Sequence, residues 1–347
     1  FRSGSYWDLK AQLEKDNITF DARLVSLKGQ RIASGNDFDE SNGQLKKKSK
    51  NVLLLQEKEA QTLSENLHSS NWNVSSVEEK PSIRKPVAPF TTSTLQQEAS
   101  FKLRMSPSRT MTIAQQLFQG IKIGGGEEGL ITYMRTDSTI LSNESMKSIK
   151  GHIKNSYGEN YFTERRYKTR SANAQEAHEA IRPTYIDRTP ESIKNFLDND
   201  QFKLYDLIWK KTVASQMTES KTLKTSLITS SSNDENSYKF KSEAEELIFD
   251  GFKKLFPEKE NKKLPNLREG ISVDIDSLNK EQKFTQHPPR YTEASLIKEM
   301  EDLGVGRPST YASILNAIKD RRYVWISGRS IYLTPIGNAL VEELKKE

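Results

Sequence analysis

The sequence predicts a multidomain fold of mixed α and β structure, and three observations lead to this prediction. Alternating apolar and polar residues, typical of half-buried strands, occur near the start of the chain and again within residues 221–252. Between these segments, residues 100–219 carry apolar side chains mainly at helical spacing. Near the end, two helical patterns meet at a glycine-containing turn and precede a hairpin pattern, which indicates a winged helix-turn-helix.

The first hundred residues contain strand and helix signals. One strand is expected from the alternating apolar residues Ile18, Phe20, Ala22 and Leu24. Residues 34–50 are polar and lysine-rich, which indicates an exposed loop, and residues 57–67 have one apolar helical face. Ser93 and Gln96 have capping-box spacing, so a helix is predicted over residues 93–104.

The helical block begins with a predicted helix over residues 109–119. The glycine-rich residues 123–129 are expected to form a flexible loop rather than a phosphate cradle, because Glu127 and Glu128 would repel phosphate. A short strand is predicted at Leu130, Ile131 and Thr132, since these residues are apolar or β-branched. Further helices are predicted from the apolar positions Met146, Ile149 and Ile153, from the Thr189–Pro190 cap, and from Leu204, Ile208 and Met217.

The remaining sequence returns to strands and then to helices. A hairpin is predicted with its turn at residues 231–237, followed by a charged linker at 258–268 and two helices that meet at 304–309. We therefore expect four parts: 1–99 with the first strands and flanking helices, 100–219 mainly helical, 220–252 with the return strands, and 253–347 resembling a winged helix.

Composition limits the possible functions only loosely. The chain has 347 residues, and its net charge of +6 favours a polyanionic partner, but 53 Lys and Arg stand against 47 Asp and Glu, so any basic surface must be local. It has no cysteine, which excludes disulfides and cysteine-bound metals, and no apolar run of membrane-spanning length. Because the sequence opens without Met or a signal-peptide pattern, we expect a piece of a longer cytoplasmic protein.

The most informative segment is residues 129–139, GLITYMRTDST. On a strand, side chains two positions apart share a face, so Tyr133 and Arg135 are expected to point the same way. A phenol has a pKa of about 10, and a guanidinium beside it can stabilise the phenolate or hold a phosphate with two hydrogen bonds. Taken alone, a tyrosine and an arginine at this spacing are more often a strand tyrosine beside a solvated arginine than a catalytic pair.

The string GLITYMRTDST closely resembles the active-site segment of the type IA DNA topoisomerases, the bacterial ones in particular. In that family the tyrosine attacks a DNA phosphodiester and forms a 5′-phosphotyrosyl link. Three further stretches agree with the family in the same order: APFTTSTLQQEAS at 88–100, AQEAHEAIRPT at 174–184, and PPRYTEASLIKEMEDLGVGRPSTYASI at 288–314. The resemblance implies that Tyr133 is the nucleophile, assisted by Arg135, and that a helical tyrosine domain is inserted into a β-rich arch.

His178 and Arg182 lie in the second of these stretches, which we expect to be helical with the two side chains one turn apart. A histidine near a phosphate can donate a proton or a hydrogen bond, although a lone histidine on an amphipathic helix is more often structural. The resemblance implies that His178 contacts the scissile or a neighbouring phosphate and that Arg182 binds DNA.

The turn GRPST at 306–310 offers a second set of phosphate contacts. Pro308 is expected to be the first residue of a helix, which places Arg307, Ser309 and Thr310 at its positive end, where free N–H groups bind phosphate. An ordinary helical hairpin with its arginine in water is the alternative. With the family motif present, the resemblance implies DNA binding by these three residues.

We expect no metal site in this chain. The family holds Mg²⁺ in an acidic cluster of an N-terminal Toprim domain, and the pairs Asp37/Asp39 and Asp274/Asp276 lack the sequence context of that cluster. We interpret all four as solvated carboxylates. The resemblance implies that Mg²⁺ belongs to a Toprim domain outside this chain and present in the full-length protein.

The resemblance further implies an ATP-independent isomerase that cleaves, passes and rejoins one strand, relaxes negatively supercoiled DNA and acts on single-stranded or underwound DNA. We expect a monomer, cytoplasmic and associated with the nucleoid, and incomplete catalysis by the piece without Toprim. A non-catalytic single-stranded DNA-binding scaffold is the alternative. A tyrosine recombinase or type IB enzyme is disfavoured because there the nucleophile follows its Arg and His residues, whereas Tyr133 precedes His178 and Arg307.

Overall fold

The computed structural model describes residues 1–49, 51–68, 70–168, 179–233, 236–258 and 263–346. The chain forms two compact units, and neither is continuous in sequence. The first, here called the β unit, comprises Phe1–Arg84, Ser220–Asp250 and Glu258–Pro289. The second, the helical unit, comprises Lys85–Glu219, Gly251–Pro257 and Arg290–Glu347. This division differs from the expected four parts, because residues 85–99 join the helical unit and residues 253–347 are split between the two units.

The β unit contains a closed cycle of six antiparallel strands. Strand β1 (Ser5–Lys15) pairs with β9 (Ser272–Phe284), β9 with β4 (Trp72–Arg84), and β4 with β7 (Ser220–Asn233). Strand β7 pairs with β8 (Asn236–Phe249), β8 with β2 (Ile18–Leu27), and β2 with β1, while β3 (Gln30–Arg31) adds to β2. Closure of the cycle into a small barrel leaves these six strands without a free edge along the paired stretch.

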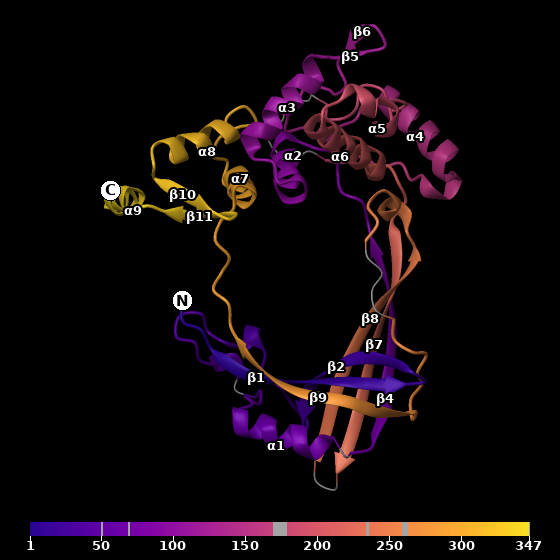
Figure 1. Ribbon diagram of the computed structural model, residues 1–347, viewed down its shortest axis with the longest axis vertical. Helices are drawn as coiled ribbons and strands as arrows, with labels where there is room; N and C mark the ends of the chain where they lie inside the picture. The colour runs from indigo at the N-terminus through magenta and orange to yellow at the C-terminus, as the bar shows by residue number, and fades with distance from the viewer. Residues whose placement is uncertain (50, 69, 169–178, 234–235, 259–262, 347) are drawn as a thin grey trace. The chain divides into compact units, whose positions relative to one another are not determined.

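The barrel is filled by alternate side chains of its strands. Leu9, Ala11 and Leu13 of β1 are almost fully buried, as the period of two along a strand requires. They join a cluster in which Trp72 and Phe240 meet edge to face, with ring centroids 5.0 Å apart. Helix α1 (Glu57–Leu67), predicted with the same bounds, lies beside β1 and β9 (Figure 1).

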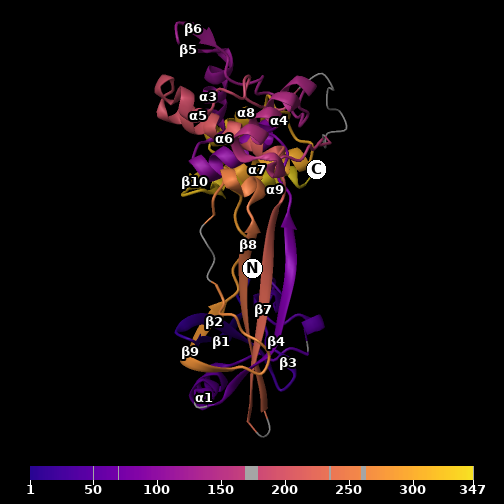
Figure 2. The same cartoon turned by 90° about the vertical axis from the view of Figure 1, so that its right-hand side faces the viewer.

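Strands β4, β7 and β8 are longer than the barrel needs. Strand β2 pairs with β8 only between Tyr238 and Lys241, and β9 pairs with β4 only at Trp72 and Asn73. The rest of the three long strands therefore continues as a three-stranded ribbon, in which they run side by side (Figures 1 and 2). The predicted hairpin is confirmed, with strands that extend farther toward its turn than expected.

The polar loop after β3 is less exposed than predicted, because Asp37, Phe38 and Ser49 are buried. Asp37 is buried, and its carboxylate accepts two hydrogen bonds from the guanidinium of Arg31, at 2.6 and 2.9 Å. It also accepts from the N–H of Ser34 and the hydroxyl of Ser49. The interpretation of Asp37 as a solvated carboxylate is therefore wrong, whereas Asp274 and Asp276 on β9 are exposed as expected.

The helical unit is built around one large apolar cluster that includes Leu95, Ile113, Leu117, Ile149 and Tyr205. Its helices and strands are α2 (Thr92–Glu98), α3 (Pro107–Gln119), β5 (Ile121–Ile123), β6 (Gly126–Glu128), α4 (Asn143–Tyr157), α5 (Pro190–Ile193), α6 (Asn199–Ser215), α7 (Glu293–Asp302), α8 (Tyr311–Asp320), β10 (Val324–Ser327), β11 (Ser330–Leu333) and α9 (Pro335–Leu344). Helix α7 packs against α2 and α8 against α3, and the hairpin β10–β11 follows α8 as predicted. Helix α9 was not predicted.

Two predictions for residues 91–129 of this unit are wrong. Helix α2 is capped by Thr91, whose hydroxyl accepts from the N–H of Thr94, and not by Ser93, and a π-helical turn (Ala99–Leu103) follows it. The glycine-rich stretch forms the hairpin β5–β6, because Gly124 and Gly125 adopt the positive φ angles of 59° and 96° that a tight turn requires. Over the described residues, no helix is long and apolar enough to cross a bilayer.

Candidate active site

The tyrosine segment, residues 129–142, is held in place by backbone hydrogen bonds to α3 and to residues 180–184. The N–H of Leu130 donates to the carbonyl of Leu117 at the end of α3, at 2.7 Å. The N–H of Thr132 donates to the carbonyl of Arg182, and the N–H of Thr184 to that of Leu130, each at 2.9 Å. The segment makes one isolated bridge, Ile131 to Pro183, so the predicted strand is an extended segment outside any sheet.

Thr92 of α2 fixes the middle of the segment. It is fully buried, and its hydroxyl donates to the carbonyl of Met134 at 2.7 Å and accepts from the N–H of Thr136 at 2.9 Å. The N–H of Thr92 donates to the carbonyl of Thr136. Sequence reasoning missed this role, although Thr92 lies in the motif at 88–100.

Tyr133 and Arg135 lie on the exposed side of the segment. Met134, Thr136 and Ser138 are buried, and the exposed residues Tyr133 and Arg135 alternate with them. Tyr133 is 42% exposed, and its ring meets the ring of Phe118 edge to face, with centroids 5.4 Å apart. The phenol and the guanidinium are thus both accessible from solvent.

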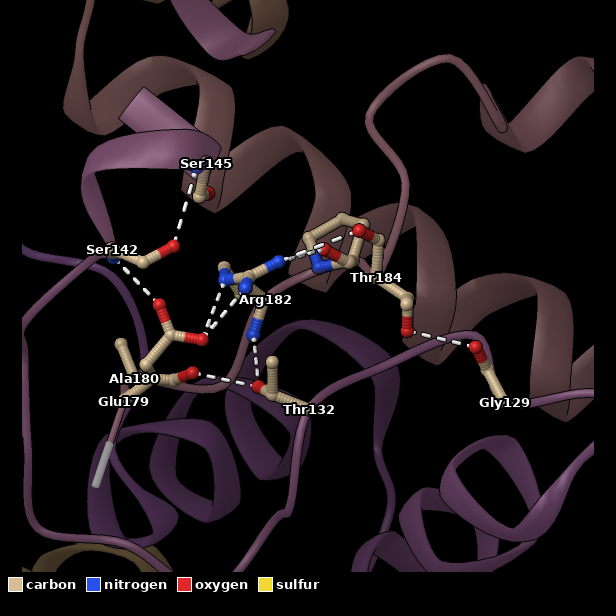
Figure 3. Close-up of polar contacts among 9 residues, drawn as sticks. Gly129, Thr132, Ser142, Ser145, Glu179, Ala180, Arg182 and Thr184 are labelled. Atoms are coloured by element: carbon tan, nitrogen blue, oxygen red, sulfur yellow. Dashed lines mark hydrogen bonds and ion pairs between the residues drawn. The ribbon is translucent and has the colours of Figure 1, made fainter. Parts of the chain in front are cut away.

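Arg182 lies beside Thr132 at the start of the segment, and Glu179 contacts Ser142 at its end (Figure 3). The Arg182 guanidinium donates to the Glu179 carboxylate at 2.6 and 3.2 Å and to the carbonyl of Pro183 at 2.9 Å. Burial opposes the ionisation of Glu179, but the hydrogen bonds from Arg182 and Ser142 outweigh it and hold the pKa of Glu179 below its usual value. Residues 179–184 are not helical, which corrects the expected helix over this part, and His178 lies outside the described residues.

The turn at 306–310 differs from the expected helix start. Helix α8 begins at Tyr311, so Pro308 and Ser309 lie in the turn before it, and the hydroxyl of Thr310 accepts from the N–H of Arg307 at 2.8 Å. Arg307 and Ser309 are exposed and Thr310 is half-buried.

Helix α2 connects this part of the chain to the tyrosine segment, because Thr92 bonds the carbonyl of Met134 and Ser93 bonds Glu301 of α7. The pKa of Tyr311 is raised, first by burial and then by the carboxylates of Glu301 and Asp137, while Arg307 acts in the opposite direction. Asp137 belongs to the tyrosine segment, and Glu301 of α7 accepts a hydrogen bond of 2.7 Å from Ser93 of α2. The motifs at 88–100, 129–139 and 288–314 therefore meet at one site within the helical unit.

Across the described ranges, the acidic residues do not form a magnesium site. Among the residues that the structure describes, no group of three or more Asp, Glu, His or Cys side chains is arranged to hold a metal ion. Asp37 bonds Arg31, and Asp274 and Asp276 are exposed on β9.

A six-stranded barrel, a helical unit and an exposed tyrosine two positions before an exposed arginine are consistent with a type IA DNA topoisomerase, and the chain belongs to this family. The model of the DNA topoisomerase family matches residues 1–347. The chain is 44% identical to DNA topoisomerase 1 of Synechococcus elongatus (96% of this chain, 38% of that protein) and 42% identical to that of Rickettsia felis (93% and 41%).

A solved structure is also similar. Full-length topoisomerase I from Thermotoga maritima matches with a TM-score of 0.80 and 34% identity, over 100% of this chain and 52% of that one. The chain thus spans about two fifths of the length of these curated relatives and half of the solved one.

Proposed function

We propose that this chain is the tyrosine-bearing part of an enzyme that changes DNA topology by cutting one strand. The oxygen of Tyr133 attacks a backbone phosphorus, the bond from phosphorus to the 3′-oxygen breaks, and a 5′-phosphotyrosine forms. The phenol loses one proton and the leaving 3′-oxygen gains one. Attack by the 3′-hydroxyl on the phosphotyrosine reverses the step, so the phosphodiester is restored without ATP.

One observation carries the proposal: Tyr133 and Arg135 are the exposed positions of a segment whose buried positions are fixed by hydrogen bonds. Such anchoring keeps the nucleophile oriented, which is a large part of catalysis by proximity. Arg135, together with Arg307 on the neighbouring turn, supplies positive charge for the phosphorane that develops during attack. Ser309, Thr310 and His178 complete the proposed phosphate contacts.

The proposed substrate is single-stranded or underwound DNA, which leads to relaxation of negatively supercoiled DNA. Arginine contacts to phosphate make the binding of single strands weaken as salt rises. We propose that Mg²⁺ is held by a Toprim domain outside this chain, and that the intact protein acts as a monomer on the cytoplasmic nucleoid. The isolated chain is then a DNA-binding scaffold with incomplete catalysis.

A cleavage assay tests this proposal. The intact protein is mixed with a single-stranded oligonucleotide labelled at its 3′ end, and the reaction is stopped with denaturant. We expect label on the protein in the wild type and none in Tyr133→Phe, and an adduct that persists in this variant contradicts the assignment. The same assay on residues 1–347 alone, with and without a Toprim domain, separates scaffold from enzyme, because full cleavage by the chain alone contradicts incomplete catalysis.

A further inference from the structure

We infer that Arg182 and Glu179 form a clamp that positions the tyrosine segment, and that Arg182 does not contact DNA. This inference rests on the proposed function, because it concerns how the nucleophile is presented. It replaces the sequence-based expectation for Arg182, and it gives Glu179 a role that the motif alone does not indicate.

The first step of the argument is the contact between Arg182 and Thr132, the residue before the nucleophile. The N–H of Arg182 donates to the hydroxyl oxygen of Thr132 at 3.0 Å, and this hydroxyl donates to the carbonyl of Ala180 at 2.7 Å. The backbone N–H of Thr132 donates to the carbonyl of Arg182. Thr132 is therefore bound from both its backbone and its side chain by residues 180–182 (Figure 3).

The second step is that Glu179 holds the other end of the same segment. One carboxylate oxygen accepts from the N–H of Ser142 at 2.6 Å, and Ser142 caps α4 through a hydrogen bond from Ser145. The other oxygen accepts from Arg182. The N–H of Ala180 also donates to the carbonyl of Ile140 at 2.8 Å. The clamp thus joins the two ends of the loop that carries Tyr133 and Arg135.

The third step is that the Arg182 guanidinium is already occupied. Of its five N–H groups, those on Nε and Nη2 face Glu179, and Nη1 donates to the carbonyl of Pro183. Its side chain is only 15% exposed, and its charge is balanced by a carboxylate at 2.6 Å. A phosphate would have to displace these partners. Arg135 and Arg307 are exposed instead, and the Arg307 guanidinium donates to the carbonyl of Gly306 at 2.9 Å.

The chain offers a matched control in the pair Arg165 and Glu219. Their N to O distance is also 2.6 Å, and their side chains are 15% and 27% exposed, against 15% and 30% for Arg182 and Glu179. The backbone of Arg165 bonds the side chain of Gln216. Within the described part of the chain, the hydrogen bonds and ion pair of Arg165 do not involve residues 129–142. Loss of either pair should therefore disturb folding similarly, while only one should disturb the nucleophile.

The experiment uses the intact protein carrying Arg182→Gln, Glu179→Gln, both changes together, or Arg165→Gln. For the first two variants we expect single-turnover cleavage of a single-stranded oligonucleotide to slow by about tenfold to a hundredfold, because a displaced nucleophile loses its alignment. The double variant should be no slower than the worse single one, since both changes break the same clamp. Arg165→Gln should cleave at the wild-type rate.

Binding of the same oligonucleotide at several salt concentrations distinguishes positioning from phosphate contact. We expect Arg182→Gln to keep the wild-type dissociation constant and the wild-type slope of log K against log salt. A slope reduced by about 0.7, the value for one phosphate contact on a single strand, would overturn the inference, as would an unchanged cleavage rate. Equal slowing by Arg165→Gln would also overturn it, because the effect would then be general destabilisation. If the proposed function itself fails, the wild type gives no Tyr133-dependent adduct, which is a separate outcome.

Discussion

Replacement of Thr92 by valine tests whether a buried hydroxyl holds the tyrosine segment in place. Valine has nearly the shape of threonine but leaves the carbonyl of Met134 and the N–H of Thr136 without the partner they have at 2.7 and 2.9 Å. An unsatisfied buried group costs about 1–3 kcal/mol, so two such groups should lower the free energy of unfolding by about 2–6 kcal/mol. Serine keeps the hydroxyl and loses one methyl group, at a cost of about 1 kcal/mol.

Urea unfolding of the wild type, Thr92→Val and Thr92→Ser measures these costs. We expect valine to be the more destabilising change, although it conserves more apolar contact than serine. In the cleavage assay Thr92→Val should lose rate while oligonucleotide affinity is kept, because Thr92 is fully buried. If serine proves the worse substitution, packing and not hydrogen bonding dominates at this position, and the reasoning is refuted.

Three further predictions concern other parts of the chain. Hydrogen bonds from Arg31 hold the pKa of Asp37 far below its usual value, so the contribution of Asp37 to stability should be present above about pH 4 and lost at lower pH. Urea unfolding at several pH values should therefore show that Asp37→Asn loses less stability on acidification than the wild type. An equal loss in both proteins would contradict this. Burial raises the pKa of Tyr167 to about 12, so the wild type should lose stability between about pH 10 and this value, and Tyr167→Phe should lose less, as followed by tyrosinate absorbance and unfolding. A methyl group on Gly129 would lie 2.7 Å from the carbonyl oxygen of Phe118, whereas one on Gly126 would have no atom within 4 Å. Thermal unfolding should show that Gly129→Ala is destabilised by about 1–3 kcal/mol and that the stability of Gly126→Ala is unchanged. Equal effects of the two substitutions would contradict the expected steric clash at Gly129.

Local patterns predicted most helices and the shared exposure of Tyr133 and Arg135, because alternation along an extended backbone does not depend on distant partners. The anchors of that segment were not predictable in this way. Thr92 and Thr136 are far apart in sequence, and a single sequence does not show that the hydroxyl of Thr92 will bond the backbone N–H of Thr136. The motif at 88–100 marked this region as important without indicating that the Thr92 side chain is buried and bonds the tyrosine segment.

Errors of the sequence interpretation arose where several residues could fill one local role. Thr91 and Ser93 each have a polar residue three positions later, and only the structure shows that Thr91 is the cap and Ser93 bonds Glu301. Asp37 was taken as solvated because its buried position depends on Arg31 and Ser49 folding back over it. For Arg182 the family motif favoured a DNA contact, whereas the positioning role that we infer for it rests on hydrogen bonds that the path of residues 179–184 sets up.

The discontinuity of the two units has a consequence for how the protein folds during synthesis. The chain passes from one unit to the other after residues 84, 219, 250, 257 and 289. Strand β9 (Ser272–Phe284) joins β1 to β4, so the cycle of strands stays open until most of this chain has left the ribosome. Until then β1 and β4 each present an unpaired edge, the kind of surface on which nascent chains aggregate. We therefore expect closure of the barrel to be slow, since it requires contacts across more than 250 residues, from Leu13 to Ile275.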